Sequence, residues 1–231
     1  FCQNRAISRR EAAGRMITEE SLAATFLSLQ RKGAANINLV TGAHYVPQII
    51  RALTLARNEG LTLPVVYNSS GYECIETLRL LDGQIDIYLP DYKYYSSYYA
   101  GLYSHAQDYR DFAVPAIDEM VRQTGAPQFD ENGTVIRHLM LPGLGGDTSQ
   151  ILRDIAVRWG NRVLVSLMRQ YTPFDMGEYP ELDRTITAEE YETACGEFRE
   201  LGLGGFFQQD ESISESFIPA FDGSGLEETE Q

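Results

Sequence analysis

Short runs rich in β-branched residues alternate along this chain with longer segments that repeat apolar residues at helical spacing. Parallel strands need a crossover connection, which is usually a helix, so this alternation predicts an α/β fold built on a parallel sheet. Five strands are predicted, at residues 37–41, 64–68, 85–89, 135–141 and 162–168. The pattern leaves a barrel and a doubly wound open sheet both possible. No G-x-G-x-x-G follows a strand, which disfavours a dinucleotide-binding Rossmann domain.

Helices are expected between and around these strands. Thr18 can cap the first of them with its side chain, and apolar residues then repeat every three or four positions. The predicted helices cover residues 18–32, 47–58, 74–81, 111–124, 148–159 and 188–201. Tyrosines crowd the stretch from 88 to 103, where spacings of four predict a helix that packs its rings along one flank. A partner-binding surface is the alternative, because Tyr is favoured at interfaces.

The composition is that of a folded globular protein, with 231 residues, 43% hydrophobic and 11% aromatic. Half of the net charge of −14 lies within residues 208–231, which contain seven acidic residues and no Lys or Arg. We therefore expect one domain over 1–207 and an acidic C-terminal tail over 208–231. An acidic chain of this kind has no electrostatic reason to bind nucleic acid or anionic lipid. The longest apolar runs are too short to span a bilayer, so no membrane partner is expected.

Three cysteines, Cys2, Cys74 and Cys195, occur without any C-x-x-C spacing. This odd number disfavours a disulfide framework and a structural zinc site, and it fits a reducing, cytoplasmic compartment. Cys74 and Cys195 fall within helical patterns. We expect both to be buried, unreactive thiols.

Polar residues follow the carboxyl ends of the predicted strands, which is where ligands gather in both architectures. These residues are Thr41, Gly42, His44, Asn68, Ser69, Ser70, Asp91, Lys93, Arg137, His138, Gln170 and Tyr171. We interpret them as one polar rim. Asp91 and Lys93 stand two residues apart in extended chain, so their side chains project to the same side. The pair can hold a zwitterion such as an amino acid, or a ribose and a carboxylate. It can also be a simple rim salt bridge, or Lys93 can be a Schiff-base nucleophile of an aldolase-type barrel.

The opening residues Phe1-Cys2-Gln3-Asn4 resemble the end of a known metal-binding signature, in which three cysteines follow a C-x-x-x-C-x-x-C spacing and an aromatic residue precedes the last one. That signature belongs to radical S-adenosylmethionine (radical SAM) proteins. Further segments resemble a family of these proteins that is similar to pyruvate formate-lyase activating enzyme. They are NINLVT (36–41), HYVPQ (44–48), VYN (66–68), DIYLPDYK (86–93), RHLMLPG (137–143), SLMRQYTP (166–173) and ESFIP (215–219).

The resemblance implies a partial (β/α)6 TIM-like barrel whose first strand and first two cluster cysteines precede Phe1. It implies that Cys2 is the third thiolate ligand of a [4Fe–4S] cluster. The residues expected to contact S-adenosyl-L-methionine, some by the resemblance and some as members of the rim, are Phe1, Gln3, Gly42, His44, Asn68, Asp91, Lys93 and His138. The acidic residue that usually accompanies the glycine is missing, because Thr41-Gly42-Ala43-His44 stands in its place. No catalytic residue is assigned.

The activity implied by the resemblance is reductive cleavage of S-adenosyl-L-methionine to a 5′-deoxyadenosyl radical. By analogy, the radical would activate a glycyl-radical enzyme, a protein or peptide substrate, with flavodoxin or ferredoxin as the electron donor. With only Cys2 of the triplet present, this chain alone is expected to be inactive. Two other classes stay open: a Schiff-base lyase that uses Lys93, and a non-catalytic barrel remnant that only binds a partner.

Overall fold

The computed structural model describes residues 16–128, 131–173 and 177–208. Six strands among these residues form one sheet in which every neighbouring pair is parallel. They are β1 (Ile37–Val40), β2 (Val65–Ser69), β3 (Ile87–Pro90), β4 (Gly133–Leu139), β5 (Leu164–Met168) and β6 (Gly205–Phe207). Their order across the sheet is their order in the sequence, so the sheet lacks the reversal of strand order that defines a doubly wound fold.

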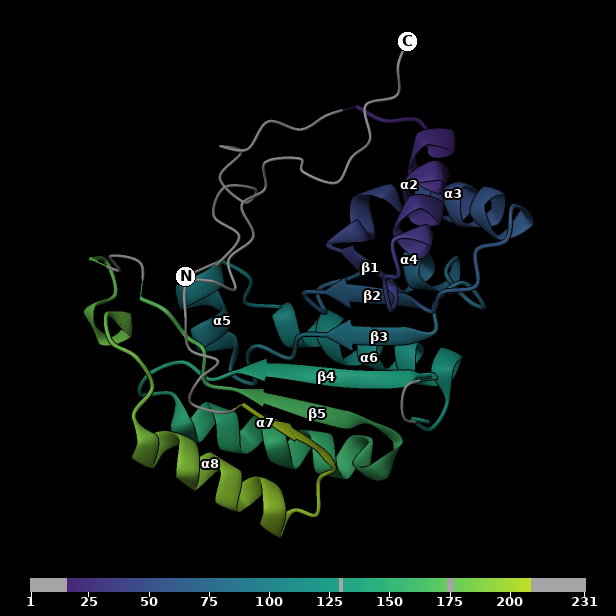
Figure 1. Cartoon of the computed structure of the whole chain (residues 1–231). Coiled ribbons are helices and arrows are strands. Elements are labelled where there is room, and N and C mark those ends of the chain that lie inside the picture. Colours follow the sequence, from purple (N-terminus) through teal and green to yellow (C-terminus); the bar gives the residue numbers. More distant parts are fainter. Residues whose placement is uncertain (1–15, 129–130, 174–176, 209–231) are drawn as a thin grey trace.

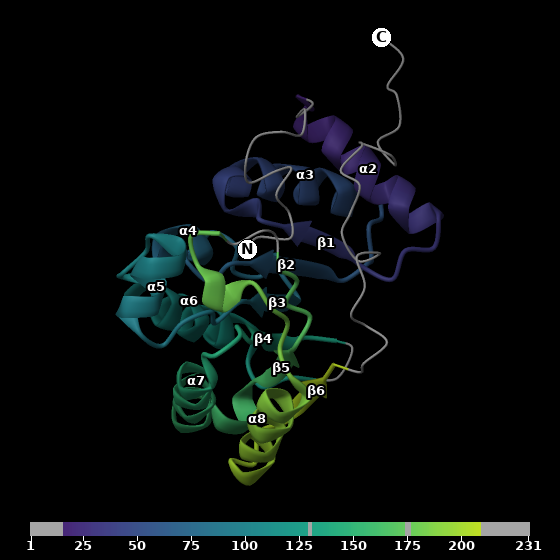
Figure 2. The same cartoon turned by 90° about the vertical axis from the view of Figure 1, so that its left-hand side faces the viewer.

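Helices cover one side of this sheet (Figure 1). They are α2 (Glu19–Arg31), α3 (Val46–Asn58), α4 (Ile75–Arg79), α5 (Ser97–Ser104), α6 (Tyr109–Thr124), α7 (Gly145–Arg158) and α8 (Ala188–Glu200), with short 3₁₀ turns η1 (Gly42–Tyr45), η2 (Gly160–Arg162) and η3 (Pro180–Leu182). Figure 2 shows that the strands follow an arc with the helices outside it. This arrangement confirms the predicted partial barrel. A strand upstream of Phe1 stays a prediction.

The helices begin and bury residues as their sequences predict. The Thr18 hydroxyl accepts a hydrogen bond from the amide of Ser21 at 3.2 Å and so caps α2. At the start of α8, Thr187 and Glu190 form a reciprocal capping box. Helix α3 buries Ile49, Ala52, Leu53 and Ala56, which lie on one face at helical spacing.

The sequence patterns missed β6 and misjudged one cysteine. Strand β6 has only three residues and begins with Gly205, so it carries too little β-branched character to be recognised. Cys195 is buried, as expected. Cys74 is exposed, so the prediction of a buried thiol is wrong there. It occupies the N-cap of α4 rather than the helix interior, and its thiol donates to Glu76 Oε2 at 2.7 Å.

Side chains of each strand alternate between the helix-covered face and the inner face of the arc. In β4, Thr134, Ile136 and His138 are buried, whereas Val135 and Arg137 are only half-buried. The buried residues of the sheet and helices form two apolar cores, one around β1, β2 and α3 and one around β5, α7 and α8. Within the parts of the chain that the structure describes, no helix combines the length and apolar character needed to cross a membrane.

The first prediction tests the core beneath β1 and β2. Leu53 in α3 is completely buried, so Leu53→Ala removes packed methyl groups and should lower the free energy of unfolding by about 2–5 kcal/mol. Leu80, at the end of α4, is 57% exposed and serves as the control, since Leu80→Ala should change stability by less than about 0.5 kcal/mol. Urea unfolding of both variants measures the difference. Equal effects would contradict this packing.

Candidate functional site

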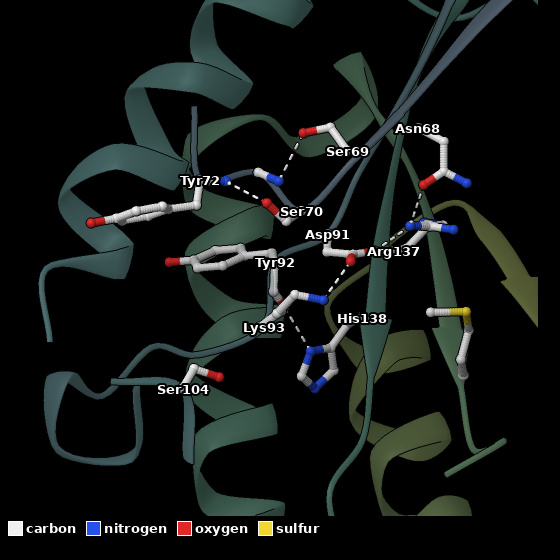
Figure 3. Close-up of polar contacts among 12 residues, drawn as sticks. Asn68, Ser69, Ser70, Tyr72, Asp91, Tyr92, Lys93, Ser104, Arg137 and His138 are labelled. Atoms are coloured by element: carbon white, nitrogen blue, oxygen red, sulfur yellow. Dashed lines mark hydrogen bonds and ion pairs between the residues drawn. The ribbon is translucent and has the colours of Figure 1, made fainter. Parts of the chain in front are cut away.

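Four polar residues from neighbouring segments form a connected group at the carboxyl end of the sheet (Figure 3). Just past β3, the Lys93 ammonium pairs with Asp91 Oδ2 at 2.5 Å. The other carboxylate oxygen, Oδ1, accepts from Arg137 Nη2 of β4 at 2.6 Å. Arg137 Nη2 also donates to Asn68 Oδ1 of β2 at 2.7 Å. We call Asn68, Asp91, Lys93 and Arg137 the rim network.

Strand register explains why these residues meet. Asp91 pairs with Arg137 across an isolated parallel bridge, which places them side by side on the inner face of the arc. Asn68 lies on the same face, because it is opposite Leu89 and thus two residues before the level of Asp91. The side chains of Asp91, Arg137 and Lys93 are 16%, 25% and 32% exposed, respectively. The rim network is therefore largely buried, but each of these three side chains keeps some exposure to solvent.

Charge in the rim network is unevenly matched. Two cations, Lys93 and Arg137, share the single carboxylate of Asp91. Arg137 Nε is buried and has no hydrogen-bond partner in the described part of the chain. An unpaired buried donor is costly, and a guanidinium binds carboxylates and phosphates well. The arrangement therefore favours an anionic acceptor beside Arg137. This local excess of positive charge stands out in a chain whose net charge is −14.

Tyr92 anchors the segment between Asp91 and Lys93 to the helix layer. Its amide donates to the carbonyl of Arg137 at 2.9 Å, and its hydroxyl donates to Asp154 Oδ2 of α7 at 2.6 Å. Burial, followed by the hydrogen bond to Asp154, raises the pKa of Tyr92 well above its usual range, so the phenol stays neutral. Because alternate residues point to opposite faces, this anchoring turns Asp91 and Lys93 toward the inner face.

His138, a predicted cofactor contact, faces the helix layer instead. Its Nδ1 lies 2.8 Å from the carbonyl of Tyr92, and its Nε2 lies 3.0 Å from the hydroxyl of Thr148. Burial lowers the pKa of His138 to about 4, so the ring is neutral at pH 7. A carbonyl only accepts, which assigns the proton to Nδ1 and leaves Nε2 to accept from Thr148. Both ring nitrogens are thus used to support the segment around Tyr92, and the geometry gives no support to a cofactor contact.

The other predicted site residues lie outside the rim network. Gly42, in η1, is buried, and a Cβ there would lie 2.8 Å from Ile49 Cδ1 and 3.3 Å from the ring of Tyr67, so the glycine is packed closely against the core and its role in cofactor binding stays a prediction. His44 is exposed, with its ring beside that of Tyr45. Phe1, Cys2 and Gln3 fall outside the described residues, and their roles stay predictions. Across the described ranges, no group of three His, Cys, Asp or Glu side chains could hold a metal ion.

The tyrosines from 88 to 103 divide into two groups. Tyr88, Tyr92 and Tyr94 precede α5 and are buried in the cores. On α5, Tyr99 and Tyr103 stack with their centroids 6.0 Å apart and their planes at 5°, which confirms the predicted ring packing for this pair, whereas Tyr94 and Tyr95 precede the helix. Tyr98 is 67% exposed. Arg137 is the rim-network member that was missing from the expected cofactor contacts, although it belongs to the polar rim.

No protein-family model matches the chain. The chain is 31% identical over 173 residues to the uncharacterized protein MJ0674 of Methanocaldococcus jannaschii. That match covers 74% of this chain and 48% of the relative, so the chain spans about half the length of the curated protein it resembles.

Two solved structures share the fold. A domain of pyruvate-formate lyase-activating enzyme from Bacteroides vulgatus has a TM-score of 0.58 and 12% identity, with coverage of 76% of this chain and 99% of that one. A radical SAM methyltransferase from Sphaerobacter thermophilus has a TM-score of 0.61 and 13% identity, with coverage of 86% and 60%, respectively. At such identities the likeness shows the fold alone, and this chain has the α/β fold found in both.

The second prediction concerns the buried histidine. The pKa of His138 is about 4 in the folded protein and about 6.5 in the unfolded chain. Between pH 6.5 and pH 4 the unfolded chain therefore binds a proton that the folded protein does not. Its contribution to stability is present above pH 6.5 and is lost as the pH falls toward 4. The difference in free energy of unfolding between the wild type and His138→Asn should therefore fall by about 3 kcal/mol as the pH is lowered from 6.5 to 4.

Urea unfolding of both proteins at several pH values checks this, and the difference between them removes the contribution of other titrating groups. A gap that stays constant from pH 7 to pH 4 would show that His138 is not held neutral in the folded state.

Proposed function

We propose that this chain is the barrel of a radical SAM enzyme and that its rim network binds S-adenosyl-L-methionine. The single observation that carries the proposal is the rim network itself. Asn68, Asp91, Lys93 and Arg137 join three adjacent segments at the carboxyl end of the strands. Ligands bind at this end in parallel α/β folds, and the fold is shared by a domain of a pyruvate-formate lyase-activating enzyme and by a radical SAM methyltransferase.

The groups of the rim network fit the polar parts of S-adenosyl-L-methionine. The methionine part of that molecule carries an ammonium and a carboxylate, and its ribose carries hydroxyls. Asp91 would accept from an ammonium or a hydroxyl, whereas Lys93 and Arg137 would donate to the carboxylate. The buried Arg137 Nε, which has no partner in the described part of the chain, is the donor best suited to that carboxylate.

The described residues do not themselves supply the ligands of a [4Fe–4S] cluster. In the proposal Cys2 is one thiolate ligand and the other two come from upstream of Phe1. When bound, such a cluster would supply the electron that breaks a carbon–sulfur bond of S-adenosyl-L-methionine. The rim network would hold and orient the ligand. A glycyl-radical enzyme as substrate, flavodoxin or ferredoxin as electron donor, and a cytoplasmic location are further parts of the proposal.

The structure weighs against the Schiff-base alternative. Nucleophilic attack on a carbonyl needs a neutral lysine amine. Lys93 instead donates to Asp91 Oδ2 in a half-buried ion pair, so its nitrogen is already engaged with a carboxylate. Treatment with borohydride in the presence of candidate aldehydes or ketones should therefore leave Lys93 unmodified, as measured by peptide mass spectrometry. Covalent trapping of one carbonyl compound at Lys93 would instead support the hypothesis of a Schiff-base lyase.

The third prediction tests the proposed ligand directly. Calorimetric titration of this chain with S-adenosyl-L-methionine should show binding at one site. Asp91→Ala and Lys93→Ala each remove a charged hydrogen bond worth about 1.5–3 kcal/mol, so each should weaken the affinity about 10- to 100-fold.

Arg153→Ala is the matched control, because it removes an ion pair between Arg153 and Glu197 in the outer helices and leaves the rim network unchanged. Its affinity should equal that of the wild type. Absence of binding by the wild type would refute the proposed function. If the affinities of Asp91→Ala and Lys93→Ala both equal that of the wild type, the ligand binds outside the rim network.

A further inference from the structure

Tyr109, the first residue of α6, places its hydroxyl where two loops of the rim meet. The hydroxyl lies 2.7 Å from the carbonyl oxygen of Asp91 and 2.9 Å from that of Ser70, and these two acceptors share its single proton. It accepts from the amide of Lys93 at 3.0 Å. One phenol oxygen therefore ties together the backbone on both sides of Tyr92 and links it to the loop that follows β2.

The surroundings of Tyr109 hold its ring firmly. The side chain is 3% exposed. The ring of Tyr72 stacks on it at 6.1 Å, and that of Tyr94 meets it edge-on at 5.7 Å. Gly71 has φ +76°, and a Cβ at this position would lie 2.4 Å from the carbonyl oxygen of Asp91. The glycine thus allows the loop after β2 to come close enough for Tyr109 to reach both loops.

The chemistry of the phenol suits this role. Burial, followed by the nearby charge of Asp91, raises the pKa of Tyr109 well above its usual range. The hydroxyl therefore keeps its proton and can donate and accept at the same time. Phenylalanine offers neither function, and it keeps nearly the same shape. The hydroxyl is thus separable from the packing of the ring.

We propose that Tyr109 is a positioning residue that fixes the spacing of Asp91 and Lys93 for ligand binding. This inference rests on the proposed function, in which the pair contacts S-adenosyl-L-methionine. Asp91 and Lys93 reach the ligand through flexible side chains, so their affinity depends on a fixed backbone beneath them. Removal of the Tyr109 hydroxyl frees the Lys93 amide and the Asp91 carbonyl, the backbone groups that flank Tyr92.

Affinity for S-adenosyl-L-methionine is the first readout. Tyr109→Phe should weaken binding about tenfold, as expected for the loss of preorganised hydrogen bonds. Tyr94→Phe is the matched control, because it removes another buried hydroxyl, which bonds Ser104 at 2.9 Å, and should leave the affinity unchanged. The double variant Tyr109→Phe/Lys93→Ala should lose less affinity than the product of the two single losses, because part of the Tyr109 effect acts through Lys93. Fully multiplicative losses would show that Tyr109 does not act through Lys93 and would overturn the role proposed for the pair.

Amide hydrogen exchange without ligand is the second readout. In the wild type the Lys93 amide should exchange far more slowly than an unprotected peptide, because Tyr109 accepts its hydrogen bond. Tyr109→Phe should accelerate that exchange at least about tenfold, and Tyr94→Phe should not. Unchanged exchange in Tyr109→Phe would overturn the inference. If that variant does not fold, fast exchange of Lys93 in the wild type would overturn it equally.

The two readouts separate this inference from the proposed function. A wild type that does not bind S-adenosyl-L-methionine refutes the function, and the exchange of the Lys93 amide then decides whether Tyr109 fixes the segment. A wild type that binds, together with a Tyr109→Phe variant of equal affinity, refutes the positioning role and leaves the function standing.

Discussion

The ion pair between Asp91 and Arg137 lies where the first three strands of the sheet meet the last three. Strands β3 and β4 are paired only at Ile87 and Tyr88, and Pro90, at the end of β3, has no amide to donate. Pairing resumes at Asp91, where the bridge to Arg137 and the ion pair between the two side chains occur together. One of the contacts that join the two halves of the sheet is therefore also the centre of the rim network.

Helix α6 unites the two halves from the outside. Ile117 and Val121 belong to the core beneath the later strands, whereas Ala116 and Met120 belong to the core beneath the earlier ones. The same helix begins with Tyr109, whose hydroxyl reaches the segment from Asp91 to Lys93. Packing, strand pairing and the candidate site thus converge on one helix and one short segment, and a disturbance in any of them reaches the others.

Much of this fold could be predicted from the sequence, because the signals are local. The helix at 18–32 has a capping threonine and periodic apolar residues, and the strand at 37–41 has a β-branched run with a glycine after it. Sequence patterns did not reveal which rim residues meet. His138 and Arg137 are adjacent in one strand and face opposite sides, and that assignment depends on the register of β4 with its neighbours. The bond from Tyr109 to Lys93 depends likewise on how α6 packs.

The contacts of the Tyr109 hydroxyl make the residues at positions 71 and 109 depend on each other during evolution. The phenol can join the two loops only while they stay close, and Gly71 permits this approach, since a Cβ there would lie 2.4 Å from the carbonyl oxygen of Asp91. Neither residue is useful for this purpose without the other. Among homologous chains, a substitution at position 71 should therefore be accompanied by one at position 109, so the two positions should co-vary as a single unit of selection.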